Sequence, residues 1–336
     1  MHKSRVTEEE EIFINQHARP GESFDHAYER LVGFRDSKGK GRNSREKGSV
    51  IKRSALAPDR YAQKSFFVAD ILDANPKADT ASLEHPLFAL RAGDRKVRHY
   101  QHNDTLIEVR PGIKGLATIH DKDVWIYCIS QLIEAMNRGR ENISRTVRFI
   151  AYDFMVTTNR RTDGDSYKRM GESLERLSES RIVTNIETDK KRERAGFGLI
   201  DSWHVVERDH DNRMVAVEVT LPEWLYRSVT ARHVLTLSRD YFRLRKPLDR
   251  RIYELARKHC GSQPKWRVKM TTLHTKSGSQ DKLYKFRAAM KVLAATNELP
   301  DYRMTIDTNN DMVIFYARGA KGGKAQMHDI KAGLIE

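Results

Sequence analysis

Residues 165–180 read DSYKRMGESLERLSES, with apolar side chains at positions 167, 170, 174 and 177. This spacing follows the turn of an α-helix and predicts a helix that buries one face. Residues 281–297 read DKLYKFRAAMKVLAATN and carry apolar side chains at positions 283, 286, 290 and 293, which is the same spacing. Two long helices with identical apolar spacing indicate an internal repeat.

Similar elements are predicted around both long helices. Around the first we expect a helix over Asp123–Met136, a strand over Thr146–Ala151, a short helix over Tyr152–Thr158, and then strands over Arg181–Thr188, Phe197–Glu207 and Met214–Thr220. Around the second we expect a helix that begins near Pro247, a strand over Trp266–Lys269, a short helix over Thr271–Lys276, and then a hairpin of Tyr302–Asp307 and Met312–Ala317. This order is typical of a winged helix, so the sequence predicts an α+β fold with two tandem winged-helix domains.

The predicted chain has four parts. Residues 1–60 form a flexible extension, acidic at first and basic afterwards. Residues 61–234 form the first winged-helix domain, which begins with a strand over Ser82–Leu90 and a hairpin of Lys96–His102 and Thr105–Arg110. Residues 235–318 form the second winged-helix domain, and residues 319–336 form a flexible tail. The competing interpretation is a pair of helical subdomains with solvated basic faces.

The composition indicates a polyanionic partner. The 336 residues include 61 Lys and Arg against 46 Asp and Glu, which gives a net charge of +15, and the mean hydropathy is −0.68. Fifteen of the basic residues lie between Arg243 and Lys291, against three acidic ones. Nucleic acid is the simplest partner for such a surplus. We expect a cytoplasmic protein with no membrane partner, because no apolar run approaches the ~18 residues of a membrane span and the first residues lack a secretory signal.

No cofactor and no metal are predicted. Cys128 and Cys260 lack metal-ligand spacing and fall in apolar helical patterns, where a reduced, buried thiol is expected. Residues 33–40 resemble a phosphate-binding loop, but their spacing is one residue too long. His99 and His102 fall on opposite faces of a predicted strand, which does not suit a shared metal.

The outward faces of the two long helices are the predicted DNA-reading surfaces. Arg169 and Lys285 occupy equivalent positions near the start of each helix, and Lys168 and Tyr284 precede them. Arg or Lys at such positions can pair with guanine O6 and N7 in the major groove. The alternative is that they are ordinary surface cations, since phosphate contacts outnumber base contacts in such interfaces.

Further basic residues are predicted to contact DNA phosphates. They flank the two long helices, lie at the tip of the predicted first wing between the strands Arg181–Thr188 and Phe197–Glu207, and lie in the segment that joins the two copies: Arg160, Arg161, Lys190, Lys191, Arg192, Arg194, Arg243, Arg245, Lys246, Lys265, Arg267, Lys269, Lys276 and Lys291. A solvated turn is an equally good interpretation of the group between Lys190 and Arg194.

Four stretches carry a resemblance to a known family. They are EHPLF at 84–88, KGLATIHDKD at 114–123, LTLSRDYFRLRKPL at 235–248 and IYELARKHCG at 252–261. Through them the chain resembles the plasmid replication initiator protein A family, from about residue 66 to about residue 293.

The resemblance implies a plasmid replication initiator. Such a protein binds specific duplex sites at a replication origin, promotes origin opening and recruits host replication proteins, including the replicative helicase. In related initiators the C-terminal winged helix dominates base contacts, which ranks Lys285 above Arg169. The N-terminal winged helix contributes phosphate contacts and dimerisation, so a homodimer is also implied.

Two other functions remain open at this point. A winged-helix transcriptional repressor would share the fold, because a fold does not fix a function. The order His210, Arg213, His233 and Tyr241 imitates that of tyrosine-type DNA strand-transfer enzymes, in which Tyr241 would attack a phosphate. His210 falls in a predicted turn, however, and we expect a protein without catalytic residues.

Overall fold

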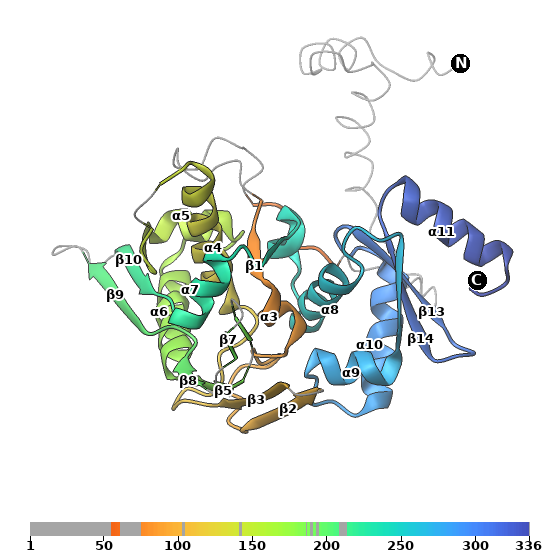
Figure 1. Cartoon of the computed structure of the whole chain (residues 1–336), viewed down its shortest axis with the longest axis horizontal. Coiled ribbons are helices and arrows are strands. Elements are labelled where there is room, and N and C mark those ends of the chain that lie inside the picture. The colour runs from red at the N-terminus through yellow and green to blue at the C-terminus, as the bar shows by residue number, and fades with distance from the viewer. Residues whose placement is uncertain are drawn as a thin grey trace, which may run out of the picture. The chain divides into compact units, whose positions relative to one another are not determined.

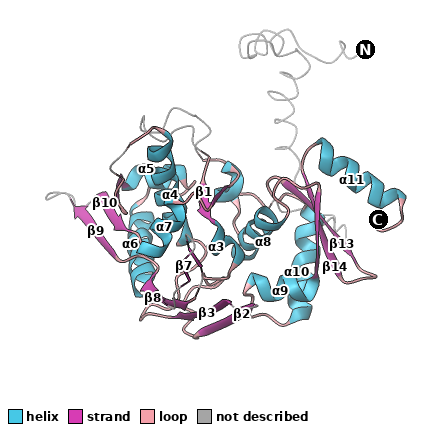
Figure 2. Cartoon of the chain, in the orientation of Figure 1, coloured by secondary structure: helices cyan, strands magenta, loops and turns pink. Residues whose placement is uncertain are grey.

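The computed structural model describes residues 55–60, 75–102, 105–140, 143–185, 187–188, 191–192, 195–207 and 214–335. Helices and strands alternate along these residues (Figures 1 and 2), so the predicted α+β fold class is confirmed. The predicted extension up to residue 54, the turn at Asn103-Asp104 and the segment from His210 to Arg213 lie outside the described residues.

The first half of the fold is built around helix α4 (Lys122–Asn137), which is buried along most of its length. The elements before α6 are β1 (Lys77–Asp79), α3 (Thr80–Glu84), β2 (Arg98–His102), β3 (Thr105–Arg110), α4, β4 (Thr146–Ile150) and α5 (Ala151–Thr157). Those from α6 onward are α6 (Gly164–Glu179), β5 (Arg181–Thr184), β6 (Glu187–Thr188), β7 (Lys191–Arg192), β8 (Ala195–Gly198), β9 (Ser202–Glu207), β10 (Met214–Thr220) and α7 (Glu223–Thr230).

The second half follows a short connection. Its elements are β11 (Val234–Thr236), the 3-10 helix η3 (Arg239–Arg243), α8 (Pro247–His259), β12 (Lys265–Lys269), α9 (Met270–Ser277), α10 (Leu283–Thr296), β13 (Tyr302–Asp307), β14 (Met312–Ala317) and α11 (Ala320–Lys331). Pro247 is the first residue of α8, where its missing amide donor costs least. Asn297 ends α10 in the left-handed conformation, and its side-chain oxygen accepts from the Met304 amide at 3.0 Å.

Two antiparallel three-stranded sheets have the same topology. Their strand orders are β4-β10-β9 in the first half and β12-β14-β13 in the second. In each, the strand that precedes a short helix lies at one edge and the last strand lies in the middle. The hairpin that corresponds to β13–β14 is therefore β9–β10.

The hairpin that we predicted as the first wing belongs to a different sheet. Strands β5 and β8 pair with each other, and β5 also pairs with β3, which gives the order β2-β3-β5-β8. The predicted strand Phe197–Glu207 is wrong as one piece, because the chain turns inward at Leu199 and Ile200, both of which are buried. The carbonyl of Leu199 accepts from the Trp125 indole at 2.7 Å, which holds this turn against α4.

Two hydrophobic cores lie on either side of α4. The first contains Trp125 and Leu174, and the second contains Tyr253 and Phe286. Ile126 of α4 belongs to the second core although its neighbours belong to the first. Helix α4 therefore contributes apolar contacts to both halves.

The predicted strand over Ser82–Leu90 is also wrong. Its first residues belong to helix α3, whose N-cap is Asp79. The Asp79 carboxylate accepts from the Ser82 amide at 2.7 Å, which satisfies a free donor of the first turn. A local cap thus overrides the strand-like alternation that the sequence shows.

The predicted flexible tail contains helix α11. Asp329 of this helix is buried, and its two oxygens accept from Lys265 Nζ and from the Tyr316 hydroxyl, both at 2.7 Å. These contacts hold α11 against β12 and β14 (Figure 1). None of the helices in the described ranges is long and apolar enough to cross a bilayer.

Candidate nucleic-acid interface

The long helices α6 and α10 bury the faces that their apolar spacing predicts. Met170 and Leu174 of α6 are fully buried in the first core. Phe286 and Met290 of α10 are buried in the second core. The opposite faces of both helices carry exposed residues, as the spacing requires.

Lys168 and Arg169 lie on the exposed side of α6. The Arg169 side chain is 59% exposed, and its Nη2 lies 3.3 Å from the Ser166 hydroxyl and 3.8 Å from the Asp163 carboxylate. Asp163 is the N-cap of α6 and accepts from the Ser166 amide at 3.0 Å. The first turn of the helix therefore steadies a guanidinium that stays accessible from solvent.

Tyr284 and Lys285 lie in the first turn of α10. Tyr284 is 62% exposed, and Lys285 is exposed as well. An exposed ammonium can pair with guanine, and an adjacent ring can contact a thymine methyl group. The exposure of both side chains is compatible with the predicted base contacts.

The predicted phosphate ligands divide into two groups. Arg245, Lys246, Lys269 and Lys291 have exposed side chains and no salt bridge among the described residues. Six others have carboxylate partners within the chain: Arg160 with Asp123 at 2.9 Å, Arg161 with Asp163 at 3.2 Å, Arg243 with Asp240 at 2.9 Å, Lys265 with Asp329 at 2.7 Å, Arg267 with Asp307 at 3.5 Å, and Lys276 with Glu84. A partner within the chain lowers the charge that such a residue can offer to DNA.

The remaining predicted phosphate ligands surround β6 and β7. Lys191 and Arg192 form β7, which pairs with β6. Lys190 and Arg194 lie outside the described residues. These residues lie between β5 and β8, and so outside the β9–β10 hairpin.

Arg287 of α10 was not among the residues predicted to contact DNA. Its Nε and Nη2 lie 3.0 and 2.6 Å from the two carboxylate oxygens of Asp311, in the turn between β13 and β14. The two-point contact raises the pKa of Arg287 and lowers the pKa of Asp311. It ties α10 to the adjacent hairpin, and the one signal in the sequence was an acidic residue in a predicted turn.

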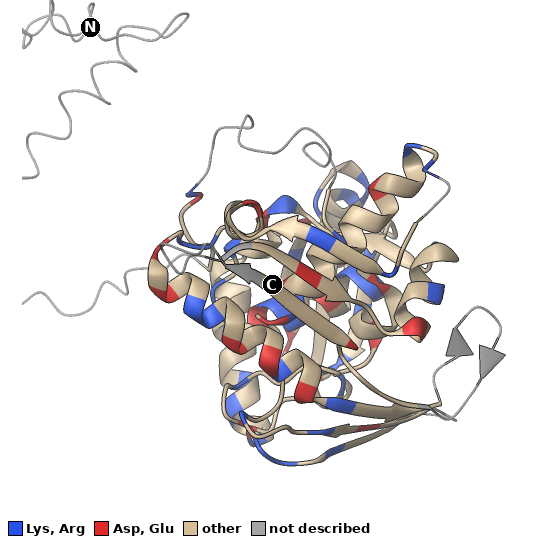
Figure 3. Ribbon diagram, turned by 90° about the vertical axis from the view of Figure 1, so that its left-hand side faces the viewer, with Lys and Arg blue, Asp and Glu red and all other residues tan. Residues whose placement is uncertain are grey.

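Charge is mixed on the side of the molecule that carries α5, α6 and β9. Figure 3, which looks onto that side, shows Lys and Arg interleaved with Asp and Glu. The local excess of basic residues lies instead between Arg243 and Lys291, in the second half.

The hydroxyl of Tyr241 is enclosed. Tyr241 is fully buried, its hydroxyl donates to Glu254 Oε1 at 2.8 Å, and burial raises the pKa of the phenol well above its usual value. A nucleophile must reach the phosphate that it attacks, which this position does not allow. His210 and Arg213 of the same hypothetical constellation lie outside the described residues.

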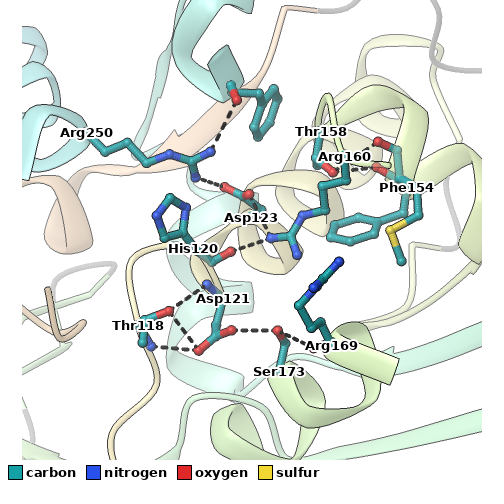
Figure 4. Close-up of polar contacts among 12 residues, drawn as sticks. Thr118, His120, Asp121, Asp123, Phe154, Thr158, Arg160, Arg169, Ser173 and Arg250 are labelled. Carbon is teal, nitrogen blue, oxygen red and sulfur yellow. Dashed lines mark hydrogen bonds and ion pairs between the residues drawn. The ribbon is translucent and has the colours of Figure 1, made fainter. Parts of the chain in front are cut away.

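A buried network joins the two halves at the start of α4. Asp123 accepts from Arg250 Nη1 of α8 at 2.6 Å and from Arg160 Nη2 at 2.9 Å (Figure 4). Beside it, Lys122 lies 2.8 Å from Glu254 of α8, with both side chains buried. These pairs connect α4 with the second half by charge as well as by apolar contact.

Asp121 connects the same turn to α6. It accepts two bonds of 2.8 Å from Arg176 and one of 2.6 Å from the Ser173 hydroxyl. These donors hold the pKa of Asp121 below its usual value despite burial. Arg176 of α6 therefore packs against the N-terminus of α4.

The family model described as Replication initiator protein A matches residues 77–304, which is more than half of the chain. The chain belongs to the replication initiator protein A family. The initiator is also 39% identical over 258 residues to a protein of Wigglesworthia glossinidia brevipalpis described as "Putative replication protein", with 76% of this chain and 94% of that protein covered.

Two solved structures share the fold of this initiator. Both are crystal structures of domains 2 and 3 of RctB. The first has a TM-score of 0.53 at 10% identity and covers 71% of the initiator and 98% of the RctB chain. The second has a TM-score of 0.50 at 8% identity and covers 73% and 99%. At this identity the likeness concerns the fold alone.

The stretch KGLATIHDKD of the initiator lies mostly in the interior of the fold. Its last three residues are Asp121, Lys122 and Asp123, all of which are buried in the network described above. His120 lies beside them, where burial and Arg250 lower the pKa of its imidazole to about 4. The residues that carried the resemblance therefore include those that join the two halves.

Proposed function

We propose that this initiator binds specific duplex DNA sites at a replication origin through two winged-helix domains, with α6 and α10 as the recognition helices. The first domain corresponds to residues 61–234, and the second to residues 235–318 extended by α11. The shared topology of the β4-β10-β9 and β12-β14-β13 sheets supports this assignment.

The observation that carries the proposal is the matching pair of outward cations, Arg169 and Lys285. Each lies near the start of a helix whose opposite face is packed in a core. Recognition helices contact bases with such N-terminal residues. Lys168 and Tyr284 are the neighbouring base contacts in this proposal.

Phosphate binding is assigned first to the exposed cations Arg245, Lys246, Lys269 and Lys291. The cations that share their charge with a carboxylate of the chain rank below them: Arg160, Arg161, Arg243, Lys265, Arg267 and Lys276. We keep as ligands of a second phosphate segment the cations of the stretch between β5 and β8: Lys190, Lys191, Arg192 and Arg194.

The remaining steps follow from the family. The bound initiator opens the origin by deforming the duplex, acts as a monomer or a homodimer, and recruits host proteins, including the replicative helicase. It needs no catalytic residue of its own for these steps, and the helicase supplies the work of strand separation.

Salt titration tests the phosphate assignment. Each phosphate contact contributes a slope of about −0.9 in log K against log salt concentration, so Lys291→Ala should flatten the slope by about one unit. Lys96→Ala is the matched control, because this exposed lysine is not among the proposed DNA contacts, and it should leave the slope unchanged. Equal slopes for wild type and Lys291→Ala would remove Lys291 from the interface.

The alternative of a repressor is tested genetically. If the gene alone allows an origin fragment to replicate in a host, the chain is an initiator in function as well as in family. Footprinting adds a second test, because repeated protected blocks favour initiation and a single palindromic block beside a promoter favours repression.

A further inference from the structure

We propose that Asp123 is a positioning residue that fixes α6 against the second half of the molecule, and so sets the separation between the two DNA segments that α6 and α10 contact. The inference rests on the proposed function, because it presupposes that both helices bind DNA. It adds a residue that touches no DNA and yet controls which spacing is bound.

The two oxygens of Asp123 serve opposite halves of the fold. Oδ1 accepts from Arg250 of α8, and Oδ2 accepts from Arg160, in the turn between α5 and α6 (Figure 4). The Asp123 side chain is 1% exposed, so water cannot replace either partner without a rearrangement. One carboxylate therefore links the approach to α6 with the first helix of the second half.

Arg250 has little freedom to move. Its Nε donates to the Leu244 carbonyl at 3.0 Å and its Nη2 to the Phe242 carbonyl at 3.3 Å. The guanidinium carbon also lies 5.0 Å from the centre of the Tyr241 ring. Because these groups surround the guanidinium, the direction from which it meets Asp123 is fixed.

The other side of the link is equally constrained. Arg160 Nη2 donates to the His120 carbonyl at 2.6 Å, and its guanidinium lies over the Phe154 ring at 5.2 Å. Helix α6 is then held along its length by the contacts of Asp121 with Ser173 and Arg176. Helix α6 thus has one orientation relative to α4, and α4 has one orientation relative to α8.

A rigid link between two DNA-binding helices has a direct consequence for binding. Major-groove sites on one side of a duplex recur every 34–36 Å, about one helical turn, so two fixed helices accept few spacings. When both bind at once, the second contact is intramolecular, and its gain is lost if the geometry forbids simultaneous binding. A loosened link should accept more spacings and should bind the preferred one less tightly.

The chain contains a matched control for Asp123. Asp249 occupies the equivalent position in the second copy, since DVWIY at 123–127 corresponds to DRRIY at 249–253. Asp249 is also buried in the first turn of its helix, but its Oδ2 has no hydrogen-bond partner among the described residues. Among the described residues, the same Asp→Asn change therefore removes a buried ion-pair link at position 123 and no salt bridge at position 249.

The test uses the full chain and fluorescent duplexes that carry the site enriched by the wild type from a random library. Base pairs are inserted between the two segments that the wild type protects, up to half a helical turn of about 5 base pairs. Wild type, Asp123→Asn, Arg250→Lys and Asp249→Asn are compared by anisotropy. Circular dichroism and thermal unfolding establish that each variant is folded.

We expect wild type and Asp249→Asn to lose on the order of 10²-fold in affinity on insertion, because one helix must release the duplex. In Asp123→Asn this loss should shrink about tenfold, with weaker binding at the preferred spacing and unchanged preferences within each segment. If Asp123→Asn does not fold, Arg250→Lys decides, since it keeps the charge and changes the geometry.

Two results separate failure of this inference from failure of the proposed function. A folded Asp123→Asn that keeps the spacing profile of the wild type overturns the positioning role, and so does an equal change in Asp249→Asn. A wild type that enriches no duplex, or protects one segment alone, contradicts the two-helix mode of binding itself.

Discussion

Arg287 of α10 and Asp311 of the β13–β14 turn form a two-point ion pair with N–O distances of 3.0 and 2.6 Å. The pair fixes a guanidinium between the candidate recognition helix and the neighbouring hairpin. Both side chains are partly exposed, so its contribution to stability is small, about 0–1 kcal/mol. We expect the ion pair to orient the Arg287 guanidinium for a DNA contact.

Asp311→Ala should therefore lower sequence discrimination rather than affinity. Loss of the carboxylate frees Arg287 and adds positive charge, so binding to non-specific duplex should strengthen while discrimination falls by about 1 kcal/mol. Competition titrations with single-base-pair variants measure both quantities. Arg287→Ala should show the same loss of discrimination, and the double variant should add nothing to it. Additive losses would show that the two residues act independently.

Asp249→Asn should stabilise the protein above about pH 6. Burial raises the pKa of Asp249 from 3.8 to about 6, although the charge of Lys246 acts to lower it. The folded state then binds the proton more tightly than the unfolded state, so the free energy of unfolding falls as pH rises from about 4 to about 6 and is constant beyond. The variant lacks this decline and should gain up to about 2 kcal/mol at neutral pH. Urea unfolding at several pH values checks it, and a variant less stable than wild type at neutral pH contradicts it.

Asp329→Asn should loosen α11. Lys265 and Tyr316 would face an amide instead of a carboxylate, and weakening two buried bonds should cost about 1–3 kcal/mol. Lys324→Ala is the matched control, because this exposed lysine of the same helix should change stability by less than about 0.5 kcal/mol. Thermal unfolding measures both variants. Similar melting temperatures for the two would mean that α11 is held by other contacts.

Tyr241→Phe should reduce the free energy of unfolding, and it should remove no reaction with DNA, because the Tyr241 hydroxyl is not a nucleophile in the proposed function. The variant removes the bond to the buried Glu254 carboxylate, at a cost of about 1–3 kcal/mol. When wild type is mixed with origin DNA and separated on a denaturing gel, we expect no covalent protein–DNA adduct. An adduct that disappears in Tyr241→Phe would instead identify a strand-transfer enzyme.

The sequence predicted the long helices well, because a buried helix face leaves a strong periodic signal. Three of the four predicted apolar positions of each helix, α6 and α10, are buried, whereas Tyr167 and Leu283 are half-buried. Pro247 begins α8 as predicted. Turns between strands left a weaker signal. We predicted the first wing between the strands at 181–188 and 197–207, but the hairpin that corresponds to β13–β14 is β9–β10. The prediction was wrong because strand pairing depends on residues far apart in the sequence.

Charged residues were the least predictable part of the candidate site. In the sequence, nothing distinguishes Lys265 and Lys276 from the exposed Lys269 and Lys291. In the structure, Lys265 forms a salt bridge with Asp329, and Lys276 forms one with Glu84. These carboxylates lie 64 and 192 residues away along the chain. Ion pairs of that kind arise from tertiary packing, which local patterns do not encode.

In the proposed mechanism, Arg169 in the second turn of α6 and Lys285 in the first turn of α10 read DNA bases. The most direct measurement compares wild type, Arg169→Ala and Lys285→Ala in competition titrations against duplexes that carry every single-base-pair change in the bound site. We predict that each variant loses about 1–3 kcal/mol of discrimination at one position of its own segment and keeps it elsewhere, with the larger loss in Lys285→Ala. Uniform weakening at every position, in both variants, would contradict the account.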